Sequence, residues 1–538
     1  MHSQQFAAGG TTAFNSRTLI PRARVTAPKS RQTTTRVQAA TMEHTTAPKS
    51  QIGLCGLAVM GQNLALNVAE KGFNISVYNR SYEKTEAAVT RAQKEGLGER
   101  LSGYKEVQDF LASLERPRRV IILVKAGAPV DATIKQLMEF MEPGDIIIDG
   151  GNEWYENTEK RKAMVAQKGL QYLGMGVSGG EEGARRGPSM MPGGSPEAYA
   201  PIKDIMEKVA AQVDDGPCVM YIGDGGSGNY VKMVHNGIEY GDMQLISEAY
   251  DILKTVGGLT NEELAAVFDK WNKGKDLASF LIEITSLIMA KKDPEGEGFL
   301  VDKILDQTGS KGTGKWAVQQ AAELSTATPT ITAALDGRYM SAIKPERVEA
   351  AKLYSSLNLN APTAVPGVNK GQLIEDVAAA LYSSKICSYA QGMNLIKAKS
   401  EEQNWNINLG NLARIWKGGC IIRAVFLEEI HDAYKRNPQL PNLLMDPEFA
   451  KKIAERHTGW RRVVSTAINA GVPVPGLSAS LSYFDTYRRD RLPANLVQAQ
   501  RDFFGSHTYQ RIDKGDAWFH TVWDETFGSA DSITTSSY

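Results

Sequence analysis

The segment "KMVHNGIEY" places four residues that could do acid–base or hydrogen-bond chemistry among apolar ones. They are Lys232, His235, Asn236 and Glu239. Because successive residues of a helix turn by about 100°, all four fall on one stripe, with apolar residues on both sides of it. A solvated helix would instead gather its charges on one broad face. The pattern predicts a helix that lines a cleft, the alternative being a polar stripe in a buried helix interface.

The first part of the chain differs in composition from the rest. No acidic residue precedes Glu43, whereas six cations lie in a stretch rich in Ser, Thr and Ala. This composition is typical of an organellar transit peptide, which we expect over residues 1–45, with a disordered basic tail as the alternative. The hydroxylated residues of "QTTTRVQAATM" favour the plastid, with the mitochondrion or the cytosol as alternative locations.

Length, charge and cysteine content restrict the class of protein. The 538 residues suffice for several domains. Residues 1–42 carry six of the 61 cations and none of the 61 acids, so the remaining 55 cations leave a slightly acidic chain, which argues against a nucleic-acid partner. No apolar run reaches membrane-spanning length, so no membrane partner is expected. The four distant cysteines indicate a reduced compartment without a disulfide framework, and no metal site is expected.

Alternating strand and helix patterns begin at Gln51. An apolar strand and a glycine turn precede a helix expected over 63–71, and "NISVYNR" follows as the next strand. Further strands are expected within 119–127 and 145–152. Apolar strands that alternate with helices predict a parallel, doubly wound α/β sheet of the Rossmann type over residues 46–227.

A large all-α region is expected next, over residues 228–485. Long helices near 229–256 and 371–400 are each followed by a similar segment, "LAAVFDKWNKGKDLASFLIEI" and "LARIWKGGCIIRAVFLEEI". This echo indicates an internal duplication of a helical unit. Residues 486–538 are aromatic and charged but too few for a core of their own, so we expect this C-terminal tail to pack on a partner subunit.

The segment "GLAVMG" follows a strand and opens a helix. Small residues here allow the backbone to approach a pyrophosphate at the helix N-terminus, which predicts a dinucleotide site. At the end of the second strand, where an NAD-specific fold places an acid, the chain has Asn79 and Arg80. A cation there favours NADP over NAD, and a surface arginine is the alternative.

Further glycine-rich segments could contact ligands. "LVKAG" and "DGGN" end strands on the ligand-binding side of an open sheet, although ordinary βα turns have the same composition. The segment 176–194 has seven glycines, which we consider too many for a buried strand. Its "SGG" could bind an anionic substrate through N–H groups and a hydroxyl, or form a flexible loop. "SKGTGKW" lacks the Walker spacing, which argues against nucleotide hydrolysis, but its lysine could still meet a phosphate.

Taken in order, these motifs resemble those of the decarboxylating 6-phosphogluconate dehydrogenases from about Gln51 to Trp523. The matching segments include "GLAVMG", "LVKAG", "DGGN", "KMVHNGIEYGDMQ", "KGTGKW" and "RD.FG.HTY". The resemblance implies conversion of 6-phospho-D-gluconate to ribulose 5-phosphate and CO₂ with reduction of NADP. It also implies a Rossmann domain, a duplicated all-helical domain, and a tail that reaches into the other subunit of a homodimer.

The resemblance further implies roles for individual residues. Lys232 would be the catalytic base and Glu239 the catalytic acid. Substrate contacts are implied for Asn152, Ser178, Gly179, Gly180, His235, Asn236, Tyr240, Lys311 and Arg338, and for Arg501 and His507 of the partner's tail. Cofactor contacts are implied for Gly56, Leu57, Ala58, Val59, Met60, Gly61, Asn79, Arg80, Ser81, Val124, Lys125, Ala126 and Asn152.

The implied chemistry explains why a lysine and a carboxyl group share one stripe. A free lysine is protonated at neutral pH, but desolvation in a closed cleft would lower its pKa towards that of a useful base. After oxidation the protonated Lys232 could stabilise the ketone oxygen, and Glu239 could protonate the product. The alternative interpretations are a β-hydroxyacid dehydrogenase of the hydroxyisobutyrate type and an NADP-binding sensor without turnover.

Overall fold

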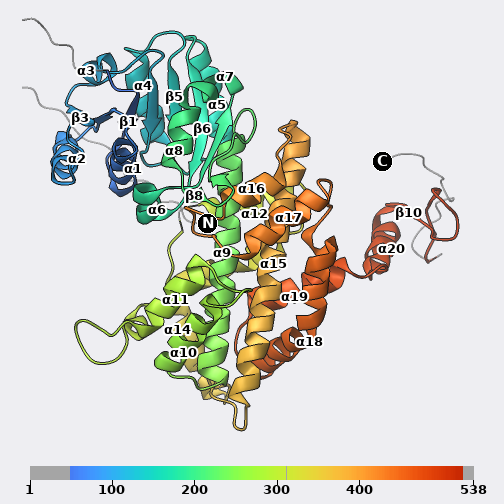
Figure 1. The fold of residues 1–538 in the computed structure, drawn as a ribbon. Helices are drawn as coiled ribbons and strands as arrows, with labels where there is room; N and C mark the ends of the chain where they lie inside the picture. The colour runs from blue at the N-terminus through green and yellow to red at the C-terminus, as the bar shows by residue number, and fades with distance from the viewer. Residues whose placement is uncertain (1–48, 311, 525–538) are drawn as a thin grey trace, which may run out of the picture. The chain divides into compact units, whose positions relative to one another are not determined.

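The computed structural model describes residues 49–310 and 312–524. In these ranges a seven-stranded sheet with helices on both faces is followed by a large helical region and a short tail (Figure 1). The expected transit peptide, residues 1–45, lies outside the described residues. Within them, no helix combines the length and the apolar character that crossing a bilayer requires.

The sheet confirms the predicted Rossmann-type organisation. Its strand order is β3-β2-β1-β4-β5-β6-β7, and neighbouring strands from β3 to β6 pair in parallel. Along β4, Ile121 packs in one core while Val120 and Ile122 pack in the other, because alternate residues of a strand face opposite sides. The strands are β1 Ile52–Cys55, β2 Ile75–Tyr78, β3 Leu101–Tyr104, β4 Arg119–Ile122, β5 Ile146–Asp149, β6 Gln171–Val177 and β7 Met190–Gly194.

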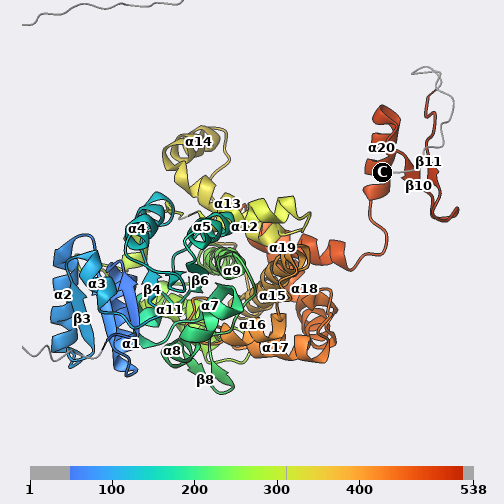
Figure 2. The same ribbon diagram turned by 90° about the horizontal axis from the view of Figure 1, so that it is seen from above.

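Helices cover both faces of this sheet, with α4 and α5 on one side and α1 and α8 on the other (Figure 2). Helix α1 begins at Val59, inside the glycine turn, rather than at residue 63 as expected. The helices of this part are α1 Val59–Glu70, α2 Tyr82–Lys94, α3 Val107–Ala112, α4 Ala128–Met138, α5 Tyr155–Ala166, α6 Gly180–Arg186, α7 Pro196–Tyr199 and α8 Lys203–Val209.

The last strand, β7, is antiparallel to β6 and fully buried. The prediction that 176–194 holds no buried strand is therefore wrong, and the sheet is not wholly parallel. The glycines have a packing function instead: a Cβ at Gly193 would lie 2.3 Å from the backbone nitrogen of Gly228, and one at Gly174 would lie 2.0 Å from Asn229 Oδ1. Strands without side chains at these points allow the helix that starts at 227 to lie directly on the sheet.

The two predicted long helices form the centre of the helical region. They are α9, Ser227–Asp251, and α15, Lys370–Gln403, which pack against each other (Figure 1). Helix α9 also packs on β6 and β7, and from Ser227 to Ile238 it is buried on every side. The other helices are α10 Asn261–Asn272, α11 Phe280–Ala290, α12 Thr313–Glu323, α13 Pro329–Ala342, α14 Lys344–Ser356, α16 Leu409–Ile415, α17 Phe426–Arg436, α18 Pro447–Asn469, α19 Pro475–Tyr487 and α20 Ala494–Gly505.

The two similar sequence segments form similar structures. Helices α10 and α11 make one helix–loop–helix unit, and α16 and α17 make the other. Their loops pair with each other: the backbone N–H of Phe280 donates to the Arg423 carbonyl at 3.1 Å, and that of Val425 donates to the Ala278 carbonyl at 3.0 Å. The bridge between Ser279 and Ala424 lies just before α11 and α17.

A buried carboxylate joins α9 to α19, the helix that leads into the tail. Glu248 of α9 is 2% exposed and accepts hydrogen bonds from the backbone nitrogens of Gly476 at 2.7 Å and Leu477 at 2.8 Å. The carboxylate satisfies N–H groups that the first turn of a helix leaves unpaired. Burial nevertheless raises the pKa of Glu248 to about 7. Beyond α19 the tail contains α20 and the short strands β10, Tyr509–Gln510, and β11, Trp518–Phe519.

Candidate active site

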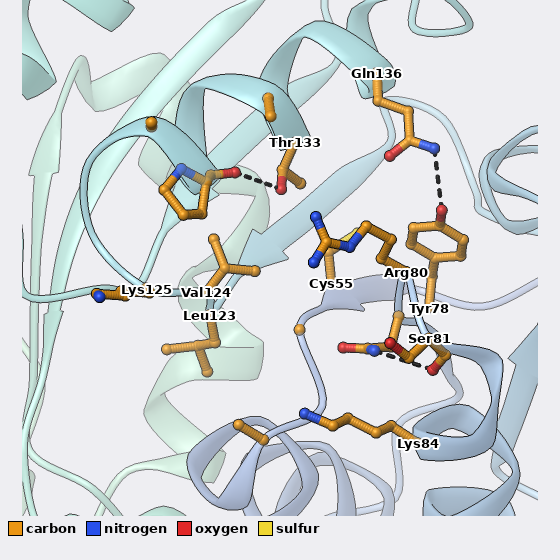
Figure 3. A pocket seen from close by; sticks show the side chains of 16 residues that line it. Cys55, Tyr78, Arg80, Ser81, Lys84, Leu123, Val124, Lys125, Thr133 and Gln136 are labelled. Carbon is orange, nitrogen blue, oxygen red and sulfur yellow. Dashed lines mark hydrogen bonds between the residues drawn. The ribbon is translucent and has the colours of Figure 1, made fainter.

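A cavity of about 610 Å³ lies at the carboxyl ends of β1, β2 and β4 (Figure 3). Among the residues predicted to bind the cofactor, those that line it are Gly56, Ala58, Asn79, Arg80, Ser81, Val124 and Lys125. This edge of an open α/β sheet is where ligands bind. The remaining predicted residues do not line the cavity. Leu57 lies in the glycine turn, Val59, Met60 and Gly61 in the first turn of α1, Ala126 in the loop after β4, and Asn152 in the loop after β5.

The glycine turn after β1 is shaped by two positions that exclude a side chain. Gly56 has a φ of +100°, and a Cβ there would lie 2.4 Å from the Leu123 carbonyl oxygen. A Cβ at Gly61 would lie 1.8 Å from the Gly56 oxygen. Asn79 holds the turn from the next strand, since its Oδ1 accepts a hydrogen bond from the Leu57 nitrogen at 3.0 Å. The turn therefore brings the N-terminus of α1 to the cavity, where it can bind a pyrophosphate.

Two cations reach into the cavity, one from the β2–α2 connection and one from the first turn of α2. The side chains of Arg80 and Lys84 both point into it (Figure 3). Within residues 49–310 and 312–524 neither forms an ion pair with a carboxylate. Ser81, which lines the cavity, is the N-cap residue of α2. The unpaired backbone N–H groups of the first turn of α2 therefore also lie at the cavity. This arrangement suits a dianionic phosphate.

Sequence reasoning missed Lys84 and the whole wall formed by α4. Lys84 lies one turn into α2, a position at which a lysine is usually solvated. The α4 wall reaches the cavity only through the packing of α4 on the sheet, and no local signal marks it. The residues that line the cavity without having been predicted are Cys55, Tyr78, Lys84, Leu123, Ala128, Pro129, Ala132, Thr133 and Gln136.

Lys232 lies at the centre of a buried polar network between α9 and the end of β6. Its Nζ donates to Asn236 Oδ1 at 2.8 Å and to Ser178 Oγ at 3.1 Å. His235 completes the network, with Nδ1 3.1 Å from Asn236 Oδ1 and Nε2 3.2 Å from Ser178 Oγ. Lys232 is 5% exposed and His235 is fully buried. The structure thus brings four of the predicted substrate and catalytic residues into direct contact.

Burial determines the protonation of this network. Desolvation lowers the pKa of Lys232, and the nearby carboxylate of Glu239 partly opposes the change. Desolvation and the charge of Lys232 together lower the pKa of His235 well below its usual value. A neutral His235 can donate from Nδ1 to Asn236 and accept from the Ser178 hydroxyl, which is consistent with both distances.

A second group of predicted residues lies along the continuation of α9. The guanidinium carbon of Arg338 lies 3.5 Å from the centre of the Tyr240 ring, and the Tyr240 hydroxyl is 3.3 Å from Ser310 Oγ. Asn236 Nδ2 donates to Thr313 Oγ1 at 3.3 Å, which ties α9 to the start of α12. Lys311, predicted to bind a phosphate here, lies outside the described residues.

The remaining predicted residues lie in the SGG segment and in the tail. Gly180 opens α6, and Gly179, with a φ of +111°, would place a Cβ 2.5 Å from the Gly419 oxygen. Arg501 donates to Gln498, and the His507 ring lies edge-on to Phe504, so these contacts are within the tail.

The thiol groups contribute little to the accessible chemistry of the site. All four cysteines lie within the described residues, and each is buried and unpaired. Burial raises the pKa of Cys55, which lies beneath the cavity, well above that of a free thiol. A thiol in this environment stays protonated and is a poor nucleophile.

Comparison with known proteins identifies the family to which this arrangement belongs. A profile of the NAD binding domain of 6-phosphogluconate dehydrogenase matches residues 51–223, and a profile of the C-terminal domain of the same enzyme matches residues 228–523. The chain belongs to the 6-phosphogluconate dehydrogenase family.

Family members are similar to the chain over nearly its whole length. The decarboxylating 6-phosphogluconate dehydrogenase 1 of Spinacia oleracea is 65% identical, with 89% of this chain and 98% of that protein covered. The chloroplastic form 1 of Arabidopsis thaliana is 66% identical with the same coverage. The solved Plasmodium falciparum 6-phosphogluconate dehydrogenase, studied in its apo form and with NADP⁺ or 6-phosphogluconate, superimposes with a TM-score of 0.84 at 52% identity and covers 88% of this chain and 100% of its own.

The packing of α9 on β6 generates a test of how the buried lysine is positioned. A Cβ at Gly176 would lie 2.5 Å from Lys232 Cβ, so Gly176→Ala should displace α9 at this residue. We expect a loss of about 1–3 kcal/mol in the free energy of unfolding, typical of overpacking, together with a large fall in kcat. Thermal unfolding and steady-state kinetics measure both.

The matched control is Gly371→Ala near the start of α15, where the nearest atom, Asn369 Oδ1, would be 3.4 Å away. This control should leave kcat unchanged. Equal kinetics for the two variants would contradict the positional role of Gly176.

Proposed function

We propose that the chain converts 6-phospho-D-gluconate to D-ribulose 5-phosphate and CO₂ with reduction of NADP⁺ to NADPH. The observation that carries this proposal is a desolvated lysine, Lys232, held by Ser178 and Asn236 on the helix that also bears Glu239. The cation-lined cavity supports NADP as the cofactor, since Arg80 and Lys84 suit a 2′-phosphate. When bound there, NADP⁺ would supply the acceptor for the hydride that leaves C3 of the sugar acid.

Lys232 serves as the base in the oxidation step. As a neutral amine it donates its two N–H groups to Ser178 Oγ and Asn236 Oδ1, which leaves its lone pair to accept the proton of the C3 hydroxyl. The C3 hydroxyl group thereby loses a proton and the C3 carbon loses a hydride, so that C3 becomes a ketone. Desolvation, which lowers the pKa of Lys232, makes the neutral amine accessible near neutral pH.

The same lysine then acts as an acid. In the 3-keto intermediate the C1–C2 bond breaks, CO₂ leaves, and the electron pair moves to the ketone oxygen, which takes the proton back from Lys232. The product of this step is an enediol. Glu239, two turns along α9 and protonated at this stage, donates a proton to the carbon that lost CO₂. The neutral Lys232 takes the proton of the 3-hydroxyl group, so that C3 becomes the ketone of the product.

Other side chains hold the substrate. His235, Asn236 and the Ser178–Gly180 segment contact the sugar acid, and Asn152 lies between substrate and cofactor. The phosphate is held by Tyr240, Arg338 and Lys311, with Arg501 and His507 from a second subunit. The stack of Arg338 on Tyr240 supports this assignment, because the ring fixes the position of the guanidinium.

Substitution of the two catalytic residues tests the mechanism. Lys232→Ala should reduce oxidation by about 10²–10⁴-fold. In the unsubstituted enzyme kcat/KM should rise with pH through a pKa lower than that of a free lysine, because the protonated amine below that pKa cannot act as a base.

Glu239→Gln should slow product formation while calorimetry still detects 6-phosphogluconate binding. Full turnover by either variant, measured by NADPH absorbance, would contradict these roles.

The cofactor preference has its own test. Arg80→Ala and Lys84→Ala should each raise the KM for NADP⁺ on the order of ten-fold, because each removes a charge-assisted contact to the 2′-phosphate. The KM for NAD⁺, which has no such phosphate, should stay the same. Lys94→Ala at the opposite end of α2 is the matched control. A parallel rise in both KM values would argue against recognition of the 2′-phosphate by these cations.

We further propose a homodimer in which each tail reaches the active site of the other subunit. The tail exposes large apolar side chains, among them Phe504 and Ile512, the latter 88% exposed. Helix α14 has no fully buried residue and exposes Leu353 and Tyr354. Apolar surfaces of this kind are typical of subunit interfaces. Residues 46–227, 228–485 and 486–538 correspond to the proposed cofactor domain, helical domain and exchanged tail.

Truncation after Arg488 tests the exchange. The shortened chain should dissociate to monomers and show a raised KM for 6-phosphogluconate, because Arg501 and His507 are lost. Sedimentation and steady-state kinetics measure these effects, and a shorter truncation after Asp524 is the control. An unchanged dimer with unchanged kinetics would refute tail exchange.

The proposed location is the plastid stroma. The proposal rests on the acid-free, hydroxylated composition of residues 1–45 and on the similarity to chloroplastic family members of Arabidopsis thaliana and Spinacia oleracea.

A further inference from the structure

One arginine of α5 binds the segments that follow β4 and β5. Arg161, 4% exposed, donates to Glu153 Oε2 at 2.6 Å and to Asp131 Oδ1 at 2.7 Å. Its Nη1 is also 3.4 Å from Asp149 Oδ2, and its Nη2 donates to the Gly127 carbonyl at 3.2 Å. These partners lie on α4, at the end of β5, and in the loops that follow β4 and β5. The guanidinium therefore links residues 127–131 and residues 149–153 to α5.

Glu153, in the loop after β5, also binds the loop after β4 directly. Its Oε2 accepts from Arg161 and also from the Gly127 backbone nitrogen at 2.9 Å, while its Oε1 accepts from the Trp154 nitrogen and from Asn157 Nδ2. Gly127 is thus bound through both its N–H and its C=O. Although burial opposes ionisation, these hydrogen bonds lower the pKa of Glu153, so the group is a carboxylate.

The two loops carry residues that flank the reacting groups in the proposed function. The loop after β4 contains Lys125 and Ala126, directly before Gly127, and the loop after β5 contains Asn152, directly before Glu153. Loops are intrinsically more mobile than the strands they follow. Hydride transfer requires reacting atoms about 3–3.5 Å apart, and an error of about 1 Å can cost on the order of 10²-fold in rate. The separation of these loops therefore matters for the chemistry.

We propose that the Arg161–Glu153 ion pair is a positioning unit for hydride transfer, which keeps the loops bearing Lys125 and Asn152 at one fixed separation. Arg161 and Glu153 are both almost fully buried and neither lines the cofactor cavity, so each acts through the backbone that it holds. The inference rests on the proposed function, because it requires these loops to border the nicotinamide and the sugar acid. Arg161 also holds α4, the wall of the cofactor cavity, through Asp131.

The same sheet contains a matched pair for comparison. Arg118 donates to Asp145 Oδ2 at 2.8 Å, and both residues are nearly buried. This pair lies immediately before β4 and β5, whereas the Arg161–Glu153 pair lies after them. The Arg118–Asp145 pair joins β4 and β5 at their amino ends, whereas the Arg161–Glu153 pair joins the segments after these strands, through Gly127, at their carboxyl ends. Only the pair at the carboxyl edge adjoins the candidate site.

The experiment compares Glu153→Gln and Arg161→Lys with the control Arg118→Lys in the full-length enzyme. Each variant is examined by thermal unfolding, by steady-state kinetics with NADP⁺, and by the kinetic isotope effect with 6-phosphogluconate deuterated at C3. Glu153→Gln and Arg161→Lys should lower kcat/KM at least ten-fold and increase the isotope effect, because mispositioning makes hydride transfer slower than the other steps. Arg118→Lys should lower thermal stability to a similar degree and leave the isotope effect unchanged.

The isotope effect separates positioning from stability, because a smaller fraction of folded enzyme lowers the rate without altering that ratio. An unchanged isotope effect in both site variants, or the same increase in Arg118→Lys, would overturn the proposal. If the buried variants do not fold, Asp131→Asn decides, since Asp131 is half-exposed and still contacts Arg161. An isotope effect equal to that of the unsubstituted enzyme would then overturn the proposal. Absence of 6-phosphogluconate oxidation in the unsubstituted chain would instead refute the proposed function.

Discussion

The structure depends on the close approach of α9 to the glycines of β6 and β7. Side chains at Gly174, Gly176 or Gly193 would collide with this helix, so their absence lets it lie directly on the sheet. Lys232 is thereby brought beside Ser178 at the end of β6. Helix α9 therefore packs both on the nucleotide-binding sheet and against α15 of the helical region. The geometry of the candidate site follows from this contact.

Burial of α9 also explains how polar groups can function in a packed interior. Charged and polar groups removed from water require hydrogen-bond partners, and here the groups of the network are partners of one another. Asn236 and Ser178 accept from Lys232, and His235 bridges the same two residues. Desolvation, which would be costly for an isolated lysine, is in this setting what lowers its pKa towards the useful range. The stability of the network and its reactivity have one cause.

Local patterns predicted much of this arrangement, and tertiary packing determined the rest. Helical periodicity placed Lys232 and Glu239 on one stripe, and a cation after the second strand indicated the phosphate-binding end of the cavity. The antiparallel direction of β7 could not be predicted, because glycines that accommodate a helix have the same composition as a loop. Arg161 was missed for a related reason. In "YENTEKRKAMVA" it resembles its solvated neighbours, and only the packing of α5 shows that it is buried.

Protonation of Glu248 is linked to folding at the contact between α9 and α19. Its pKa, about 7, is higher than that of a glutamate in an unfolded chain, so folding favours the protonated form of this group. The stabilisation that it contributes is complete below the unfolded pKa and declines as the pH rises through about 7. The acid–base balance of the surrounding compartment therefore bears on how firmly the helix before the tail is anchored to the helix that carries Lys232.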